Sequence, residues 1–187
     1  MQFIKLEKVK DGRYLKNYEI TYQNKAGREK KYEIVSRKEI HSVDELGKTV
    51  NGVSMAVLKD DKLLLLREFR MGINCYIYNL VAGMKEENES IEACIERELY
   101  EETGLRLKKV NKILPPSYAA VAISDIMTQV AFIEAEGDFE DHTSENEMIE
   151  AALYTQDEVK NMLEQEKFSS RAQVIAYFFA YHPEVFK

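Results

Sequence analysis

Three glutamates near the end of one predicted helix have the spacing of a metal site. Glu98, Glu101 and Glu102 lie within about one helical turn of each other. Carboxylate oxygens gathered so closely are what a hard divalent cation such as Mg²⁺ requires. This cluster is therefore the first candidate for chemistry in the chain.

A single helix over residues 91–102 is expected to hold these glutamates. Ser90 is a good N-cap, because its hydroxyl can accept from a free backbone N–H of the first turn. Gly104 suits the left-handed position just after a helix end. The residues between the two ends include neither Gly nor Pro, so the spacing predicts one uninterrupted helix.

This helix places two of the glutamates on the side that should be buried. At about 100° per residue, Glu98 and Glu102 fall on the apolar side, and Glu101 lies at its edge. Glu92 and Glu96 should instead face solvent. The apolar face is formed by Ile91, Cys94, Ile95 and Leu99.

The charges of Glu98 and Glu102 require compensation. The two residues are i and i+4 neighbours that repel each other, and burying them together is costly. Either they protonate, or a cation lies among them, or this end of the helix is in water. Arg97 neutralises part of the charge, and it can reach back to Glu89 and fix the loop before the helix. A solvated acidic helix would explain a lone glutamate pair, but not the whole pattern.

The remaining elements predict a sheet that positions this helix. Strands are expected at 50–58, 62–67, 76–81, 110–114, 127–135 and 149–154, with a tight turn at 59–61. The strand at 76–81 leads into a loop at Gly83. Two helices, at about 156–165 and 170–181, close the chain. This order predicts an α+β domain, an α/β/α sandwich with a mixed β-sheet between helices.

The N-terminal region has a different composition. Residues 3–42 are expected to form short antiparallel strands, including 14–22 and 31–36 on either side of a turn. This segment has many charges and few large aliphatic residues, so it must lean on the rest of the chain or on a second subunit. We predict a small antiparallel β-sheet subdomain at 1–45 and the main domain at 46–187.

Composition limits the partners of the protein. The 187 residues are 45% hydrophobic and 32% charged, and the net charge is −7. An acidic chain gains little from a nucleic-acid backbone, so we expect neither DNA nor RNA as a partner. Apolar runs of membrane-spanning length are absent from the sequence, and residues 1–8 carry charges where a signal peptide needs an apolar stretch. We expect a soluble, cytoplasmic protein with no membrane partner.

Residues 83–105 resemble a known signature. The positions that the Nudix box defines are all matched, by Gly83, Glu89, Arg97, Glu98, Leu99, Glu101, Glu102, Gly104 and Leu105. The chain is therefore similar to the Nudix hydrolases, which cleave a nucleoside diphosphate linked to another group. The resemblance implies the Nudix fold, and it implies that Glu89 and Arg97 form a structural pair within the catalytic box.

The same resemblance implies a cofactor and its ligands. Mg²⁺ would be the cofactor, and Mn²⁺ stays open. Glu98 and Glu102 would be the main ligands, and Glu101 would share in the binding. The backbone carbonyl of Ala82 would complete the set.

Features outside the box resemble the ADP-ribose (nucleotide-sugar) pyrophosphatase branch. They are the β-rich N-terminal segment, the strand residues 66–70, and the C-terminal stretches 144–147 and 172–176. By this resemblance Arg70 and Arg67 would bind phosphate oxygens. A general base would come from the acidic loop as Glu145 or Glu147, with Glu145 slightly favoured. The alternative for this loop is a solvated surface turn.

The predicted reaction is Mg²⁺-dependent cleavage of ADP-ribose to AMP and ribose 5-phosphate. Other nucleotide sugars of the GDP-mannose type and dinucleotides are alternatives, because Asn79 stands where the branch often has a glutamate and Pro115 and Pro116 come early. A nucleotide-binding module that does not cleave its ligand, a house-cleaning triphosphatase and an isomerase are further alternatives. The resemblance also implies a homodimer in which the N-terminal sheet of one subunit helps to cover the other's site.

Overall fold

The computed structural model describes residues 1–140, 142 and 148–186. The chain divides into two compact units. The first combines Met1–Asn51 with Pro116–Thr128, and the second combines Gly52–Pro115 with the described residues of 129–187. Each unit has a hydrophobic core of its own.

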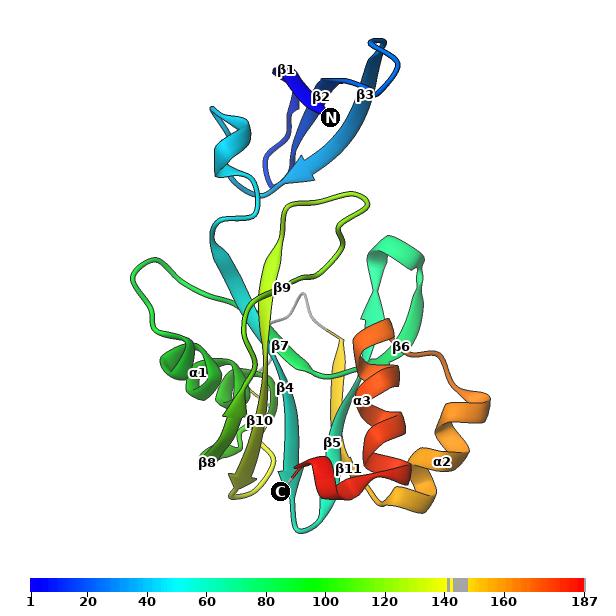
Figure 1. Cartoon of the computed structure of the whole chain (residues 1–187). Coiled ribbons are helices and arrows are strands. Elements are labelled where there is room, and N and C mark those ends of the chain that lie inside the picture. The colour runs from blue at the N-terminus through cyan, green and yellow to red at the C-terminus, as the bar shows by residue number, and fades with distance from the viewer. Residues whose placement is uncertain (141, 143–147, 187) are drawn as a thin grey trace. The chain divides into compact units, whose positions relative to one another are not determined.

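An antiparallel sheet in the order β1-β2-β3 forms most of the first unit (Figure 1). Its strands are β1 (Gln2–Asp11), β2 (Lys16–Gln23) and β3 (Glu29–Ser36), followed by a 3₁₀ helix at Val43–Glu45. The predicted antiparallel strands are present. The core of this sheet is small, as its charge-rich composition predicts, and it consists of Tyr18, Ile20, Ile34 and Ile40.

A larger sheet in the order β11-β5-β4-β10-β8 has most of its residues in the second unit, while Val50–Asn51 and the strand residues within Pro116–Thr128 belong to the first. The strands of this sheet are β4 (Val50–Lys59), β5 (Lys62–Arg70), β6 (Cys75–Asn79), β7 (Val81–Met84), β8 (Arg106–Ile113), β9 (Ser117–Tyr118), β10 (Met127–Glu136) and β11 (Ile149–Tyr154). The pairs β11–β5, β5–β4 and β10–β8 are antiparallel. Because β4 and β10 run in the same direction (Figure 1), the sheet is mixed, as predicted.

Helices cover both faces of this sheet. They are α1 (Ile91–Thr103), α2 (Gln156–Gln165) and α3 (Ser170–Tyr181), with 3₁₀ helices at Met71–Ile73 and Pro183–Phe186. In β5, Leu64 and Leu66 pack in the core cluster of α1, whereas Leu63 and Leu65 pack in the cluster of α2 and α3. Side chains alternate along a strand, so an unbroken leucine run is what a strand buried on both faces needs. The predicted α/β/α sandwich is confirmed.

The sheet divides between β4 and β5. These strands pair at Leu58–Leu63 and Lys59–Lys62, and then each continues with a different partner. Strand β6 pairs with β5, and strand β7 pairs with β4. Figure 1 shows β4 and β5 separating beyond the tight turn that joins them. We call this division the fork, with β5 and β6 as one branch and β4 and β7 as the other.

The fork corrects one prediction. Gly83 was expected in a loop, but it lies in β7 opposite Val53. The apolar run at 76–81 forms two strands instead of one, because the chain leaves β5 after Asn79 and joins β4 at Val81. The choice of partner depends on residues far away in the chain, so the local pattern does not reveal this change.

Local signals fix both ends of α1. The Ser90 hydroxyl accepts a hydrogen bond from the N–H of Ala93 at 3.1 Å. Gly104 adopts the left-handed conformation, with φ of 75°, and its N–H donates to the carbonyl of Tyr100 at 2.8 Å. The predicted helix is confirmed, and it extends one residue further, to Thr103.

Candidate active site

Glu98 lies against the backbone of β7. Its side chain is 13% exposed, and a Cβ atom on Gly83 would lie 1.6 Å from the Glu98 carboxyl carbon. Only a glycine leaves room for the carboxylate at this point. The burial of Glu98 raises the pKa of its carboxyl group, although the neighbouring Arg97 opposes this shift.

Glu102 reaches the same strand one turn further along α1. Its carboxylate accepts a hydrogen bond from the backbone N–H of Ala82 at 3.2 Å. Glu101 lies at the edge of the helix, with a side chain that is 54% exposed. Helix α1 therefore directs Glu98 and Glu102 toward adjacent residues of β7, while Glu92 and Glu96 are exposed, as their helical positions predict.

Arg97 joins three carboxylates. Its guanidinium binds both oxygens of Glu89, with Nε–Oε1 at 2.8 Å and Nη2–Oε2 at 2.9 Å. The Nη1 atom donates to Glu98 at 2.8 Å and to Glu101 at 3.0 Å, and Nη2 also donates to the carbonyl of Met84 at 3.0 Å. Arg97 thus ties the loop before α1 to the helix, and this group keeps a net negative charge.

The pairing of Glu89 predicts a stability that depends on pH. Hydrogen bonds from Arg97 and from the N–H of Glu86 lower the pKa of Glu89 from 4.5 to about 2. A carboxyl group whose pKa is lower in the folded protein than in the unfolded chain stabilises the fold at pH values above the unfolded pKa. This contribution disappears as the pH falls through the folded pKa. We expect the melting temperature of the wild type to exceed that of Glu89→Gln above pH 4.5, and the gap to close between pH 4.5 and about 2.

Thermal unfolding followed by circular dichroism would measure this gap at each pH. Glu87→Gln makes the same chemical change at an exposed position of the same loop, and it should show no gap that varies with pH. A difference between wild type and Glu89→Gln that stayed constant over this pH range would contradict the assignment.

The oxygen donors of this cluster suit a hard cation. Within residues 1–140, 142 and 148–186, no group of three or more His, Cys, Asp or Glu side chains is gathered closely enough to hold a metal ion. Glu98 and Glu101 instead both accept hydrogen bonds from Nη1 of Arg97. The donors fit nevertheless, because carboxylates are the ligands that Mg²⁺ prefers, and the net negative charge of this group favours added positive charge.

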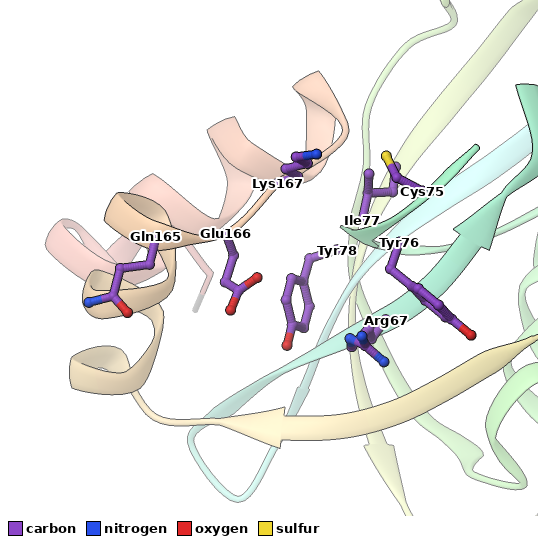
Figure 2. Close-up of a pocket in the computed structure, with 8 residues that line it drawn as sticks. All are labelled: Arg67, Cys75, Tyr76, Ile77, Tyr78, Gln165, Glu166 and Lys167. Atoms are coloured by element: carbon purple, nitrogen blue, oxygen red, sulfur yellow. The ribbon is translucent and has the colours of Figure 1, made fainter. Parts of the chain in front are cut away.

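The two predicted phosphate-binding arginines point to opposite faces of the sheet. Arg70 shares the face of Leu66 and α1 by the alternation of β5, and its guanidinium lies 3.3 Å from the carboxylate of Glu68. Arg67 shares the other face, where it lies 4.2 Å from the centre of the Tyr76 ring. Figure 2 shows Arg67 in a pocket with Tyr76 and Tyr78. The structure therefore brings Arg70, but not Arg67, to the side of Glu98.

The predicted general bases, Glu145 and Glu147, lie outside the described residues. Among those described, a polar network marks the β6 branch of the fork. Asn79 donates to the buried carboxylate of Glu68 at 2.7 Å, and the hydroxyl of Ser169 donates to the Asn79 side-chain oxygen at 2.6 Å. The sequence analysis singled out Asn79 but missed Glu68, whose signal was a carboxylate on the face of β5 that also carries Leu64 and Leu66.

The NUDIX domain matches residues 48–178 of this chain, and the chain belongs to that family. It is 28% identical to the ADP-sugar pyrophosphatase of Mus musculus over 137 residues, which are 71% of this chain and 60% of that protein. It is 29% identical to the ADP-ribose pyrophosphatase of Bacillus subtilis (strain 168) over 112 residues, 59% of this chain and 60% of that protein. The matches thus span about 60% of the length of these two relatives.

A crystal structure described as an ADP compounds hydrolase shares the fold. It superposes with a TM-score of 0.75 at 19% sequence identity, covering 95% of this chain and 90% of the other. The three helices of the described residues include none that is long and apolar enough to cross a membrane.

Proposed function

We propose that the protein is a metal-dependent pyrophosphohydrolase that cleaves the diphosphate of a nucleoside diphosphate linked to a sugar. The observation that carries this proposal is the placement of Glu98 and Glu102 against Ala82 and Gly83, with Arg97 bound to Glu98. ADP-ribose is the leading substrate, and AMP and ribose 5-phosphate are the products. The names of the two pyrophosphatase relatives support this choice.

The mechanism follows from charge. A diphosphate is anionic, so attack by hydroxide is electrostatically opposed. A bound Mg²⁺ or Mn²⁺ ion would supply Lewis-acid chemistry, activating water and neutralising phosphate oxygens. Glu98 and Glu102 would hold the ion, helped by Glu101 and the carbonyl of Ala82, and Arg97 would keep Glu98 oriented.

The remaining roles belong to groups around this centre. Arg70, on the same face as Glu98, would bind phosphate oxygens after leaving the Glu68 carboxylate. A general base must take the proton of the attacking water, and Glu145 or Glu147 of the acidic loop would do so. In this hydrolysis the oxygen of the attacking water bonds to one phosphorus atom, the bond from that phosphorus to the bridging oxygen breaks, and two phosphate monoesters are released.

A substrate panel tests this function. The full chain would be incubated with ADP-ribose, GDP-mannose, a diadenosine polyphosphate and ATP, each with Mg²⁺, with Mn²⁺ or with EDTA, and the mononucleotide released would be measured by chromatography. We expect AMP from ADP-ribose in the presence of metal, at a higher rate than product from the other compounds, and none in EDTA. Absence of diphosphate cleavage throughout the panel would overturn the proposal.

A homodimer is part of the same proposal. The first unit carries an apolar hollow of about 470 Å³ whose lining includes Tyr32, Leu46 and Val121, and Val121 is 69% exposed. An exposed apolar hollow of this kind fits burial against a second copy. Light scattering during size-exclusion chromatography would test it, and a mass of one chain at all concentrations would rule the dimer out.

A further inference from the structure

Arg171 is a partly buried cation that has no role in the mechanism proposed above. It lies in the first turn of α3, and its Nη1 atom donates to the hydroxyl of Ser54 at 2.7 Å. In the part of the chain that the structure describes, Arg171 forms no ion pair with a carboxylate, and this hydroxyl is its one hydrogen-bond partner. A guanidinium has five N–H donors, so most of its donor capacity is unused.

This environment favours an anionic ligand. Partial burial lowers the pKa of Arg171, because the charged form loses hydration there. The group nevertheless stays protonated in a protein, so its charge persists. A cation that has lost water without gaining a carboxylate destabilises the fold, and it attracts an incoming anion more strongly than a cation in water does.

Arg171 connects the two branches of the fork. The residues before α3 are bound to the β6 branch, since the N–H of Tyr78 donates to the carbonyl of Lys167 at 2.7 Å and the N–H of Ser169 donates to the carbonyl of Tyr78 at 3.0 Å. From this branch the side chain of Arg171 reaches Ser54, which belongs to β4 on the other branch. The first turn of α3 is therefore anchored at the fork on both sides.

The far branch carries the carboxylate site. Ser54 is the register partner of Ala82, whose N–H is bound by Glu102. The guanidinium of Arg171 thus contacts the strand position next to Ala82. Ser54 lies between Val53 and Met55, which pack in the core cluster of α1, so its side chain points to the α3 face of β4. A ligand with several anionic oxygens that lies in the fork can therefore be bound by Arg171 from the α3 face and by metal held by the carboxylates from the α1 face.

We propose that Arg171 binds a phosphate group of the nucleoside diphosphate substrate at the fork. This inference rests on the proposed function, and it adds a phosphate-binding residue that lies outside the Nudix box and on a different helix. The ligand class is a phosphate ester or diphosphate, and charge-assisted hydrogen bonds from the guanidinium to its oxygens are the basis of recognition.

Kinetics of Arg171→Gln and Arg171→Lys in the full chain test this role. For the nucleotide sugar that the wild type hydrolyses, we expect kcat/KM to fall about 10- to 100-fold in Arg171→Gln, the loss that corresponds to a hydrogen bond from a charged donor. Arg171→Lys should recover part of this loss, because it keeps the charge but not the planar fork of donors. Arg106→Gln removes an exposed arginine of the same unit and should match the wild type.

Thermal stability separates binding from a structural role. Removing a desolvated cation that lacks a carboxylate partner should leave the melting temperature of Arg171→Gln unchanged or raise it. A fall of more than a few degrees in both Arg171→Gln and Arg171→Lys would assign the residue a structural role and overturn the proposal.

Metal-free binding distinguishes this inference from the proposed function. Calorimetry with ADP-ribose in EDTA should show weaker binding to Arg171→Gln than to the wild type. If the wild type hydrolyses the nucleotide sugar and Arg171→Gln equals it in kcat/KM and in binding, the role of Arg171 is wrong while the function stands. If the wild type hydrolyses nothing, the function is wrong, and weaker binding by Arg171→Gln would still support a phosphate site whereas equal binding would overturn it.

Discussion

Glu102→Gln is expected to lower the turnover of the nucleotide sugar by about 100-fold or more, since even the residues behind metal ligands are worth 10- to 100-fold. Glutamine keeps the shape of the side chain and can still accept from the N–H of Ala82, which lies 3.2 Å from the carboxylate in the wild type. It removes the negative charge that would hold the ion. Steady-state kinetics with Mg²⁺ and the melting temperature would be measured together, and folding should be unaffected.

Glu96→Gln is the matched control for this change. It makes the same substitution on the same helix, at a position that faces solvent. Its turnover should equal that of the wild type. Near-normal turnover in Glu102→Gln would remove the basis for placing the metal at this end of α1.

Gly83→Ala is expected to reduce turnover on a similar scale, about 100-fold, because it displaces a ligand without deleting it. The new Cβ atom would lie 1.6 Å from the carboxyl carbon of Glu98, so the carboxylate must move. The atom that gives way is the far end of a flexible side chain, and the cost in stability should therefore be small. The expected result is a variant with a near-normal melting temperature and little activity.

Gly72→Ala provides the comparison for this prediction. A Cβ atom on Gly72 would meet nothing within 4 Å, and this glycine does not have a positive φ. Its activity and stability should be those of the wild type. Full activity in Gly83→Ala would show that the position of the Glu98 carboxylate does not matter for hydrolysis.

The sequence predicted the helices well because their end signals are local. Ser90 and Gly104 bound α1, and α2 and α3 have the predicted ranges. It also placed Glu98 and Glu102 on the buried side of α1, which the helical repeat alone determines.

Features that depend on partners distant in the chain were not predicted. The fork places Gly83 in a strand, and no local pattern indicates that β6 and β7 pair with different neighbours. The alternation of side chains along β5 explains why Arg67 and Arg70 point to opposite faces. Which of these faces α1 covers depends on the pairing of the whole sheet, and the local sequence does not reveal it. Arg171 gave no signal, because its role arises from a contact with Ser54, 117 residues earlier in the chain.

The fork has a consequence for how such an enzyme could be altered. The groups proposed to hold the metal lie on one continuous stretch, from Ala82 to Glu102, whereas Arg171 reaches the fork from α3. Metal binding and this phosphate contact are therefore encoded by different parts of the gene. Randomising the first turn of α3 should therefore change the affinity for the phosphate groups of the substrate while the metal ligands stay in place.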